Sequence, residues 1–174
     1  MHDLQAAVEP LIPALRRYAR ALLRDRAAAD DLVHDCLERT ISRWHQRRGD
    51  GDARAWVFAI LHNLAMNRLR QRARRGAHVA LDDADDPALA RPPAQEDQLR
   101  HGDLVRALAE LPADQRSVLL LVAVEDLSYA EAARVLDVPI GTVMSRLSRA
   151  RERLHRLMDD LPASARPNRL RSVP

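Results

Sequence analysis

Apolar residues recur three or four positions apart through most of the chain, which is the spacing of one face of an α-helix. The helices that this pattern predicts cover about residues 11–24, 27–46, 53–75, 96–111 and 112–125. Residues 1–9 are expected to form a short extra turn or to be disordered, and Asp52 is a natural N-cap for the third helix. The predicted fold class is therefore all-α.

Two further helices joined by a tight turn are predicted between Ser128 and Met158. Ser128 followed by Glu131 has the spacing of a capping box, which marks the start of the first of these helices. Pro139 stops this helix, and we expect Gly141 to let the backbone bend into the second. This combination is typical of a helix-turn-helix, whose second helix enters the major groove of DNA.

The second helix of this pair has an apolar stripe and a basic stripe. The apolar stripe consists of Val143, Leu147, Ala150, Leu154 and Leu157. The basic stripe, one position earlier each time and so about 100° round the helix, consists of Arg146, Arg149, Arg153 and Arg156. An arginine-rich amphipathic helix can also be an ordinary solvated surface helix, but the capping box and the turn favour a phosphate-facing role.

The third predicted helix also has two faces. Its core face consists of Val57, Leu61, Leu64 and Ala65, and a neighbouring stripe consists of Trp56, Ile60, Asn63, Asn67, Arg70 and Arg74. Aromatic rings and guanidinium planes stack on unpaired bases, and amides read base edges, so the stripe resembles a nucleic-acid surface. The alternative is that Trp56 belongs to the core and the asparagines are merely solvated.

The second predicted helix separates apolar from acidic positions. Its expected buried face consists of Leu32, Val33, Cys36, Leu37, Ile41 and Trp44. The opposite, mostly acidic face consists of Asp31, His34, Glu38 and Ser42, with Asp35 on its flank.

Charge is strongly patterned although the net charge is only +3. All 28 basic residues are arginine, which a GC-rich genome explains as well as function does, so only their positions are informative. Basic clusters at 66–76 and 146–156 flank an acidic segment at 81–87, a pattern that suggests nucleic acid for the clusters. A single cysteine excludes a disulfide within the chain and fits a reducing cytoplasm, and no targeting signal or membrane-length apolar run is present.

The chain divides into two small helical bundles, at residues 10–76 and 96–158. The linker, residues 77–95, contains four aspartates and three prolines, and it could reach ~65 Å if fully extended. The tail, residues 159–174, is expected to be disordered.

These residues resemble the extracytoplasmic-function (ECF) sigma factors of the bacterial sigma-70 family, over about residues 10–158. Residues 31–35, DLVHD, are similar to a segment of the family's region 2 that binds the polymerase clamp. Trp56, Ile60 and residues 63–65 match the pattern of the promoter-melting region. Region 4, which reads the −35 element, is matched by Leu111-Pro112, Ser128-Tyr129, residues 131–133, 141–143, 145–147 and 149–151.

Three positions depart from the family pattern. His34 replaces the usual glutamine, which adds possible pH sensitivity to the polymerase contact. Asn67 replaces a common aspartate and makes the stripe less negative, and Met144 replaces a common basic residue and removes a potential phosphate contact.

The resemblance implies that the chain directs core RNA polymerase to promoters. It places the polymerase contact at Asp31, Leu32, His34 and Asp35. It places −10 binding at Arg47, Arg48, Trp56, Asn63, Asn67, Arg70 and Arg74. It places −35 binding at Thr142, Ser145, Arg146, Arg149, Arg153 and Arg156. The implied partners are the β and β′ subunits of core RNA polymerase, promoter DNA and, as a further candidate, an anti-sigma factor. Membrane insertion, a small-molecule substrate, a cofactor, a metal ion and a catalytic group are not expected.

Two other classes of protein fit the sequence less well. A free-standing helix-turn-helix regulator would explain the second half of the chain but neither the acidic helix nor the Trp/Asn stripe. An enzyme using His34, Asp35 and Cys36 is disfavoured, because consecutive helical residues point about 100° apart and cannot converge on one metal ion.

Overall fold

The computed structural model describes residues 2–47, 52–76 and 95–159, with side chains from 3 in the first range and from 102 in the last. Every regular element in these ranges is helical. The first half contains α1 (His2–Val8), α2 (Ile12–Leu23), α3 (Arg26–Arg43) and α4 (Ala53–Arg74), with short 3-10 segments at Glu9–Leu11 and Trp44–Gln46. The second half contains α5 (Gln95–Ala109), α6 (Ala113–Leu119), a π-helical turn at Leu120–Val124, α7 (Tyr129–Leu136) and α8 (Ile140–Asp159). The all-α prediction is confirmed.

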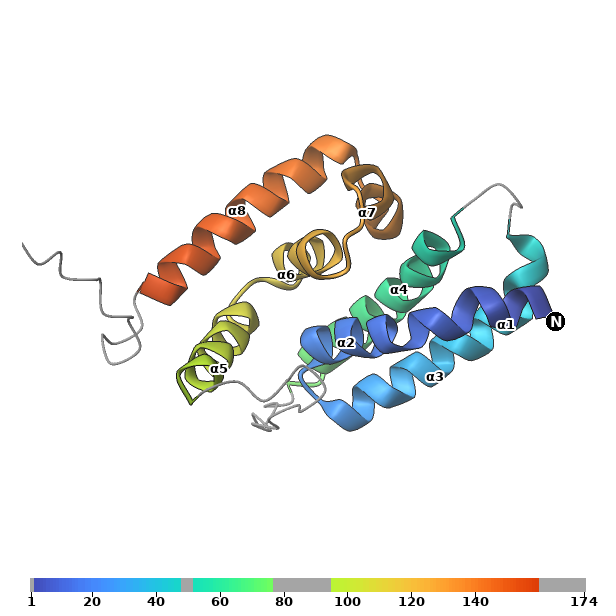
Figure 1. The fold of residues 1–174 in the computed structure, drawn as a ribbon, viewed down its shortest axis with the longest axis horizontal. Helices are drawn as coiled ribbons and strands as arrows, with labels where there is room; N and C mark the ends of the chain where they lie inside the picture. Colours follow the sequence, from blue (N-terminus) through green and yellow to red (C-terminus); the bar gives the residue numbers. More distant parts are fainter. Residues whose placement is uncertain (1, 48–51, 77–94, 160–174) are drawn as a thin grey trace, which may run out of the picture.

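The two halves lie against each other (Figure 1). Helices α2, α3 and α4 pack together in the first half, and α6, α7 and α8 pack together in the second. Contacts between α4 and α7, and between α2 and both α5 and α6, join the halves. One continuous apolar cluster consequently includes buried residues of both. None of the described helices is both long enough and apolar enough to cross a membrane.

Side-chain caps fix where the helices of the first half begin. The Asp25 carboxylate accepts a hydrogen bond from the Ala28 N–H at 2.9 Å and so begins α3. The Asp52 carboxylate accepts one from the Arg54 N–H at 2.9 Å, which confirms the predicted N-cap of α4. Arg24, with a φ of 55°, takes the left-handed conformation that ends α2 and turns the chain into α3.

The N-terminal residues form more structure than expected, because α1 and the following 3-10 turn continue almost directly into α2.

The buried face of α3 is shifted from the predicted one. Ile41, predicted to be core, is 59% exposed, whereas the neighbouring Thr40 is fully buried. The Thr40 hydroxyl donates to the Cys36 carbonyl at 2.8 Å, and this bond satisfies the polar group that burial removes from water.

The helix-turn-helix is present, but its turn is made differently from the prediction. Both bonds of the Ser128–Glu131 capping box are formed. The left-handed residue between the helices is Asp137, with a φ of 53°, and not Gly141, which lies inside α8. Aspartate tolerates this backbone region better than most residues, so the turn does not require the flexibility of glycine. The linker and tail predictions fall largely on residues 77–94 and 160–174, outside the described residues.

A hydrogen-bonded pair of polar side chains, Tyr18 of α2 and His62 of α4, is buried inside the first half. The Tyr18 hydroxyl and His62 Nδ1 are 3.0 Å apart and hydrogen-bonded, and His62 is only 7% exposed. Burial, together with the positive charges of Arg146 and Arg70, lowers the pKa of His62 to about 4. His62 is therefore neutral in the folded protein at neutral pH.

We predict that His62 makes stability depend on pH between about 4 and about 6.5. In this interval the unfolded state binds a proton that the folded state excludes, so the free energy of unfolding falls as pH falls, by about 3 kcal/mol in total. Urea unfolding of His62→Gln at pH 7 and pH 4.5 should show a smaller loss than the wild type. The control His45→Gln, at an exposed position, should show the full loss. An undiminished loss in His62→Gln would contradict the prediction.

Candidate nucleic-acid interface

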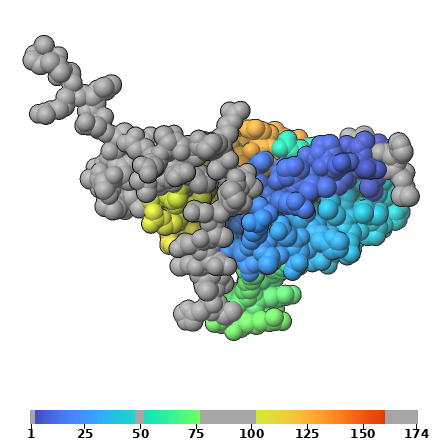
Figure 2. Space-filling model, turned by 60° about the horizontal axis from the view of Figure 1, so that its bottom comes forward, coloured from blue at the N-terminus to red at the C-terminus, as the bar shows by residue number. Residues whose placement is uncertain are grey.

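The outer stripe of α4 is accessible over most of its length. Asn63, Asn67, Arg70 and Arg74 are exposed, and Trp56 and Ile60 are half-buried. The Asn67 Oδ1 accepts a hydrogen bond from Arg70 Nη2 at 2.8 Å, so these two side chains form a preset polar pair. The C-terminal end of α4 projects beyond α2 and α3 (Figure 2). The predicted stripe is thus polar and exposed at Asn63, Asn67, Arg70 and Arg74, and its N-terminal end consists of the half-buried Trp56 and Ile60.

Two arginines on the other side of α4, Arg68 and Arg72, bind to neighbouring helices instead of facing solvent. Arg68 Nη2 pairs with the Asp35 carboxylate at 2.6 Å, and Arg68 Nη1 donates to the Ala28 carbonyl at 2.7 Å. Arg72 pairs with Asp25 at 2.8 Å, and this pair, after the Ala28 N–H bond and against some desolvation, helps to lower the pKa of the Asp25 carboxyl. These two arginines hold α4 against α3. The arginines that remain exposed at this end of α4 include Arg70 and Arg74 of the outer stripe.

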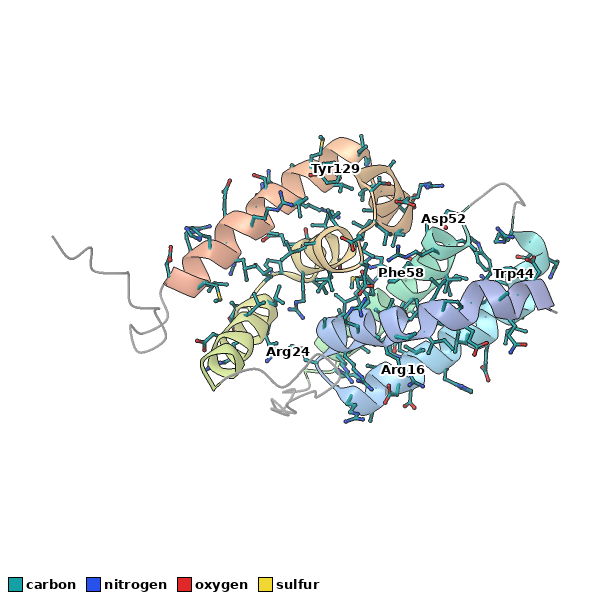
Figure 3. All side chains as sticks on the ribbon, in the orientation of Figure 1. Arg16, Arg24, Trp44, Asp52, Phe58 and Tyr129 are labelled. Atoms are coloured by element: carbon teal, nitrogen blue, oxygen red, sulfur yellow. The ribbon has the colours of Figure 1, made fainter. Side chains whose placement is uncertain are left out.

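An aromatic pair lies at the N-terminal end of the stripe. The rings of Trp44 and Trp56 are 6.1 Å apart in an edge-to-face arrangement, and the Arg47 guanidinium lies 4.6 Å from the centre of the Trp44 ring. Trp44 and Asp52, which lie on either side of residues 48–51 in the sequence, are labelled in Figure 3. The sequence placed Trp44 in the core, but it is half-buried and supports Trp56. Arg48, also predicted to bind here, lies outside the described residues.

The acidic face of α3 is exposed as predicted, with one exception among the candidate contacts. Asp31 and His34 are exposed, and His34 Nε2 lies 3.2 Å from the Glu38 carboxylate. Asp35 is half-buried because of its pair with Arg68. Leu32 is fully buried, so its side chain packs in the core and is not available to a partner in this structure.

The basic stripe of α8 is mostly accessible. Arg149, Arg153 and Arg156 are exposed, whereas Val143, Leu147 and Ala150 of the apolar stripe are buried. Arg146 differs, since its Nε lies 3.4 Å from the Asp114 carboxylate of α6 and its side chain is 29% exposed. Met144 is 52% exposed and therefore faces outward. Ser145 is exposed and donates to the Thr142 carbonyl at 3.1 Å, and Thr142 itself is half-buried.

The described residues contain no group of three or more His, Cys, Asp or Glu side chains placed to hold a metal ion. Cys36 is fully buried, and burial raises the pKa of its thiol to about 12, so the thiol stays protonated. The accessible chemistry is that of guanidinium, amide, indole and carboxylate groups on helix surfaces.

Comparison with known families covers both halves of the chain. Residues 8–62 match the family described as the Sigma2 domain of PhyR, and residues 101–154 match sigma-70 region 4. These matches give no support to a free-standing regulator built around the second half alone.

Relatives and solved structures agree with the family matches. The chain is 35% identical to the ECF RNA polymerase sigma factor EcfG of Rhodopseudomonas palustris, over 90% of this chain and 83% of the relative. It is 35% identical to the ECF sigma factor SigC of Mycobacterium tuberculosis, over 77% of this chain and 72% of the relative.

Among solved structures, the sigma factor RpoE of Bartonella quintana, in complex with the anti-sigma factor NepR, has a TM-score of 0.77 at 32% identity. That match covers 93% of this chain and all of the RpoE chain. CnrH, in complex with the cytosolic domain of CnrY, has a TM-score of 0.68 at 25% identity, over 91% of this chain and 89% of CnrH. With both sigma regions present in order along nearly the whole chain, this protein belongs to the ECF RNA polymerase sigma factors.

Proposed function

We propose that three separate surfaces of this sigma factor divide the work of promoter recognition. The exposed face of α3 around Asp31 and His34 binds core RNA polymerase. The outer stripe of α4 with the Trp44–Trp56 pair binds unpaired bases of the −10 element. The exposed arginines of α8 bind the −35 duplex.

One observation carries this proposal. The α4 stripe offers flat groups and amides, which suit unpaired bases, whereas α8 offers a row of guanidinium groups, which suits a duplex backbone. The two surfaces lie on different helices in different halves of the chain. A protein with one reading surface for single strands and another for a duplex is suited to opening DNA at a fixed distance from a recognised site.

The proposal assigns no bond-making step to this chain. The polymerase carries out the chemistry, and the sigma factor supplies base capture and phosphate neutralisation. An anti-sigma factor is a further proposed partner, because RpoE and CnrH, which share this fold, are described in complexes with NepR and CnrY.

Run-off transcription with purified core polymerase tests the function as a whole. A template carrying the region upstream of the chain's own gene should give a defined transcript with the sigma factor present and none with core alone. DNA binding that proceeds equally well without core polymerase, with no transcript, would contradict the proposal.

For the polymerase contact, we predict that Asp31→Arg lowers affinity for core polymerase at least tenfold, since it reverses an exposed charge at the proposed interface. Asp31 is preferable to Asp35, whose replacement would also break the pair with Arg68. The matched control is Asp3→Arg, the same reversal at an exposed position of α1. Affinity and circular dichroism should be measured for both, and equal core binding by the two variants would reject the assignment.

For the −35 surface, we predict different defects from two arginines of the same stripe. Arg149→Ala should relax base preference within the −35 element, at a cost of ~1–3 kcal/mol in discrimination, because Arg149 lies about two turns closer than Arg156 to the start of α8, the end that enters the groove. Arg156→Ala should weaken binding about equally on every sequence and reduce the salt dependence by about one phosphate contact. A promoter library transcribed by each holoenzyme separates the two, and identical profiles would contradict the division.

For the −10 surface, we predict that Asn63→Ala and Asn67→Ala impair promoter opening and leave −35 duplex binding unchanged. Their proposed partners are unpaired bases, which exist only after melting. Permanganate footprinting of each holoenzyme should show reduced reactivity of the melted region. Gln71→Ala, which removes an exposed amide of α4 outside the stripe, is the matched control for general effects on this helix. Normal melting by both asparagine variants would mean that the stripe is only a solvated face.

A further inference from the structure

The two halves of the chain meet along a seam that contains buried charge. Within it, Glu125 is 1% exposed and Arg116 is 8% exposed. A hollow of about 300 Å³ lies mostly among residues of the first half, including Leu22 and Leu69, and Arg116 of the second half contributes to its lining. Interfaces of this mixed polar character are typical of domains that move relative to each other.

The ion pair between Arg17 and Glu125 crosses the seam, and both carboxylate oxygens of Glu125 accept a hydrogen bond in it. Arg17 of α2 donates from Nε to Glu125 Oε1 at 2.9 Å and from Nη2 to Oε2 at 2.7 Å. Arg54 of α4 donates to the Glu125 main-chain carbonyl. Arg116 of α6 donates from Nη1 to the Leu22 carbonyl at 3.1 Å in the other direction. Arginine side chains thus connect the halves at three points.

The pair is asymmetric, and this makes the closed arrangement sensitive to one side chain. The side chain of Arg17 is 35% exposed, whereas that of Glu125 is 1% exposed. Without Arg17, a carboxylate would remain buried with no ion-pair partner of its own, which is strongly unfavourable. Separation of the halves would let water reach that carboxylate, so loss of Arg17 favours opening.

The closed arrangement does not suit the proposed function. Helix α7 of the helix-turn-helix packs directly on α4, the helix that carries the proposed −10 surface. The −10 and −35 elements lie roughly 50 Å apart along a B-DNA duplex. One molecule with α7 and α4 in contact therefore cannot place its two DNA surfaces on both elements together.

We propose that the Arg17–Glu125 ion pair is the contact that holds the two halves of the free chain closed, so that its loss shifts the chain toward an arrangement with the halves apart. The consequence for transcription rests on the proposed function, but the closed state itself is a property of the chain alone. Fully extended, residues 77–94 have a reach of roughly 60 Å, which is sufficient for the separation.

The test is a distance measurement on the full chain. Dyes on Ala6→Cys of α1 and Ala130→Cys of α7, both exposed positions, in a Cys36→Ser background report the separation by energy transfer. Arg17→Ala should lower the closed-to-open ratio by roughly 100-fold or more. Arg16→Ala, an exposed neighbour on the same helix and labelled in Figure 3, is the matched control and should leave the distance unchanged. A folded Arg17→Ala chain with unchanged transfer would overturn the proposal.

A charge exchange guards against the possibility that Arg17→Ala perturbs folding. Arg17→Glu and Glu125→Arg should each lower energy transfer, and the double variant should recover at least tenfold of the lost closed-to-open ratio. Circular dichroism and urea unfolding establish that each variant is folded. Double-variant transfer no higher than that of the two single variants would overturn the ion pair as the cause of closure.

A binding measurement then separates this proposal from the function. If closure competes with polymerase binding, Arg17→Ala should bind core polymerase more tightly, by the factor by which the open fraction rises. Opening of Arg17→Ala without core binding by any form of the chain would reject the proposed function and leave the closed state intact. Core binding by the wild type, with no change in distance or affinity in Arg17→Ala, would reject the ion pair alone.

Discussion

The buried carboxylate of Glu125 is the constraint on which the relation between the two halves depends. A charge removed from water must be paired, and its partner, Arg17, comes from the opposite half of the chain. Glu125 lies directly after the π-helical turn that continues α6, and the next residue, Asp126, takes the left-handed conformation. The position of Glu125 is therefore fixed by the end of this turn. With Glu125 fixed in this way, α6 lies against α2 and α7 against α4. The position of the helix-turn-helix therefore depends on the ion pair as well as on apolar packing.

Arginine is suited to this architecture in a way that lysine is not. Its planar fork can satisfy a carboxylate and a main-chain carbonyl at once, as Arg68 does with Asp35 and Ala28. Arg116 bonds to carbonyls of Leu22, Ala109 and Leu111, and burial lowers its pKa without making a neutral form relevant at physiological pH. Among the described residues, some arginines therefore join helices, whereas others face solvent, including those of the stripes on α4 and α8.

Features set by neighbouring residues were predictable from the sequence, and features set by distant residues were not. The Asp52 cap, the capping box and the two stripes of α8 depend on residues within one or two turns, and all were predicted. Burial of Thr40 in place of Ile41 was missed, because a bond to the Cys36 carbonyl makes a hydroxyl acceptable in the core. Trp44 was misplaced because its partner, Trp56, follows the intervening loop. The Arg17–Glu125 pair joins residues 108 positions apart, a separation at which no local pattern exists.

Arg146 differs from the other arginines of the α8 stripe because it already has a partner within the second half. It belongs to the stripe proposed to read DNA, yet its Nε lies 3.4 Å from Asp114, and its charge contributes, after burial, to the lowered pKa of His62 in α4. The start of α8 is therefore close enough to the first half for its charge to be felt there. A phosphate or a guanine edge would have to replace Asp114 as the partner of this guanidinium, so part of the binding free energy at this position is offset by the bond that is lost. Arg149, Arg153 and Arg156 are exposed and have no ion pair of this kind among the described residues, so within the basic stripe of α8 it is at Arg146 that an ion pair inside the second half competes with DNA binding.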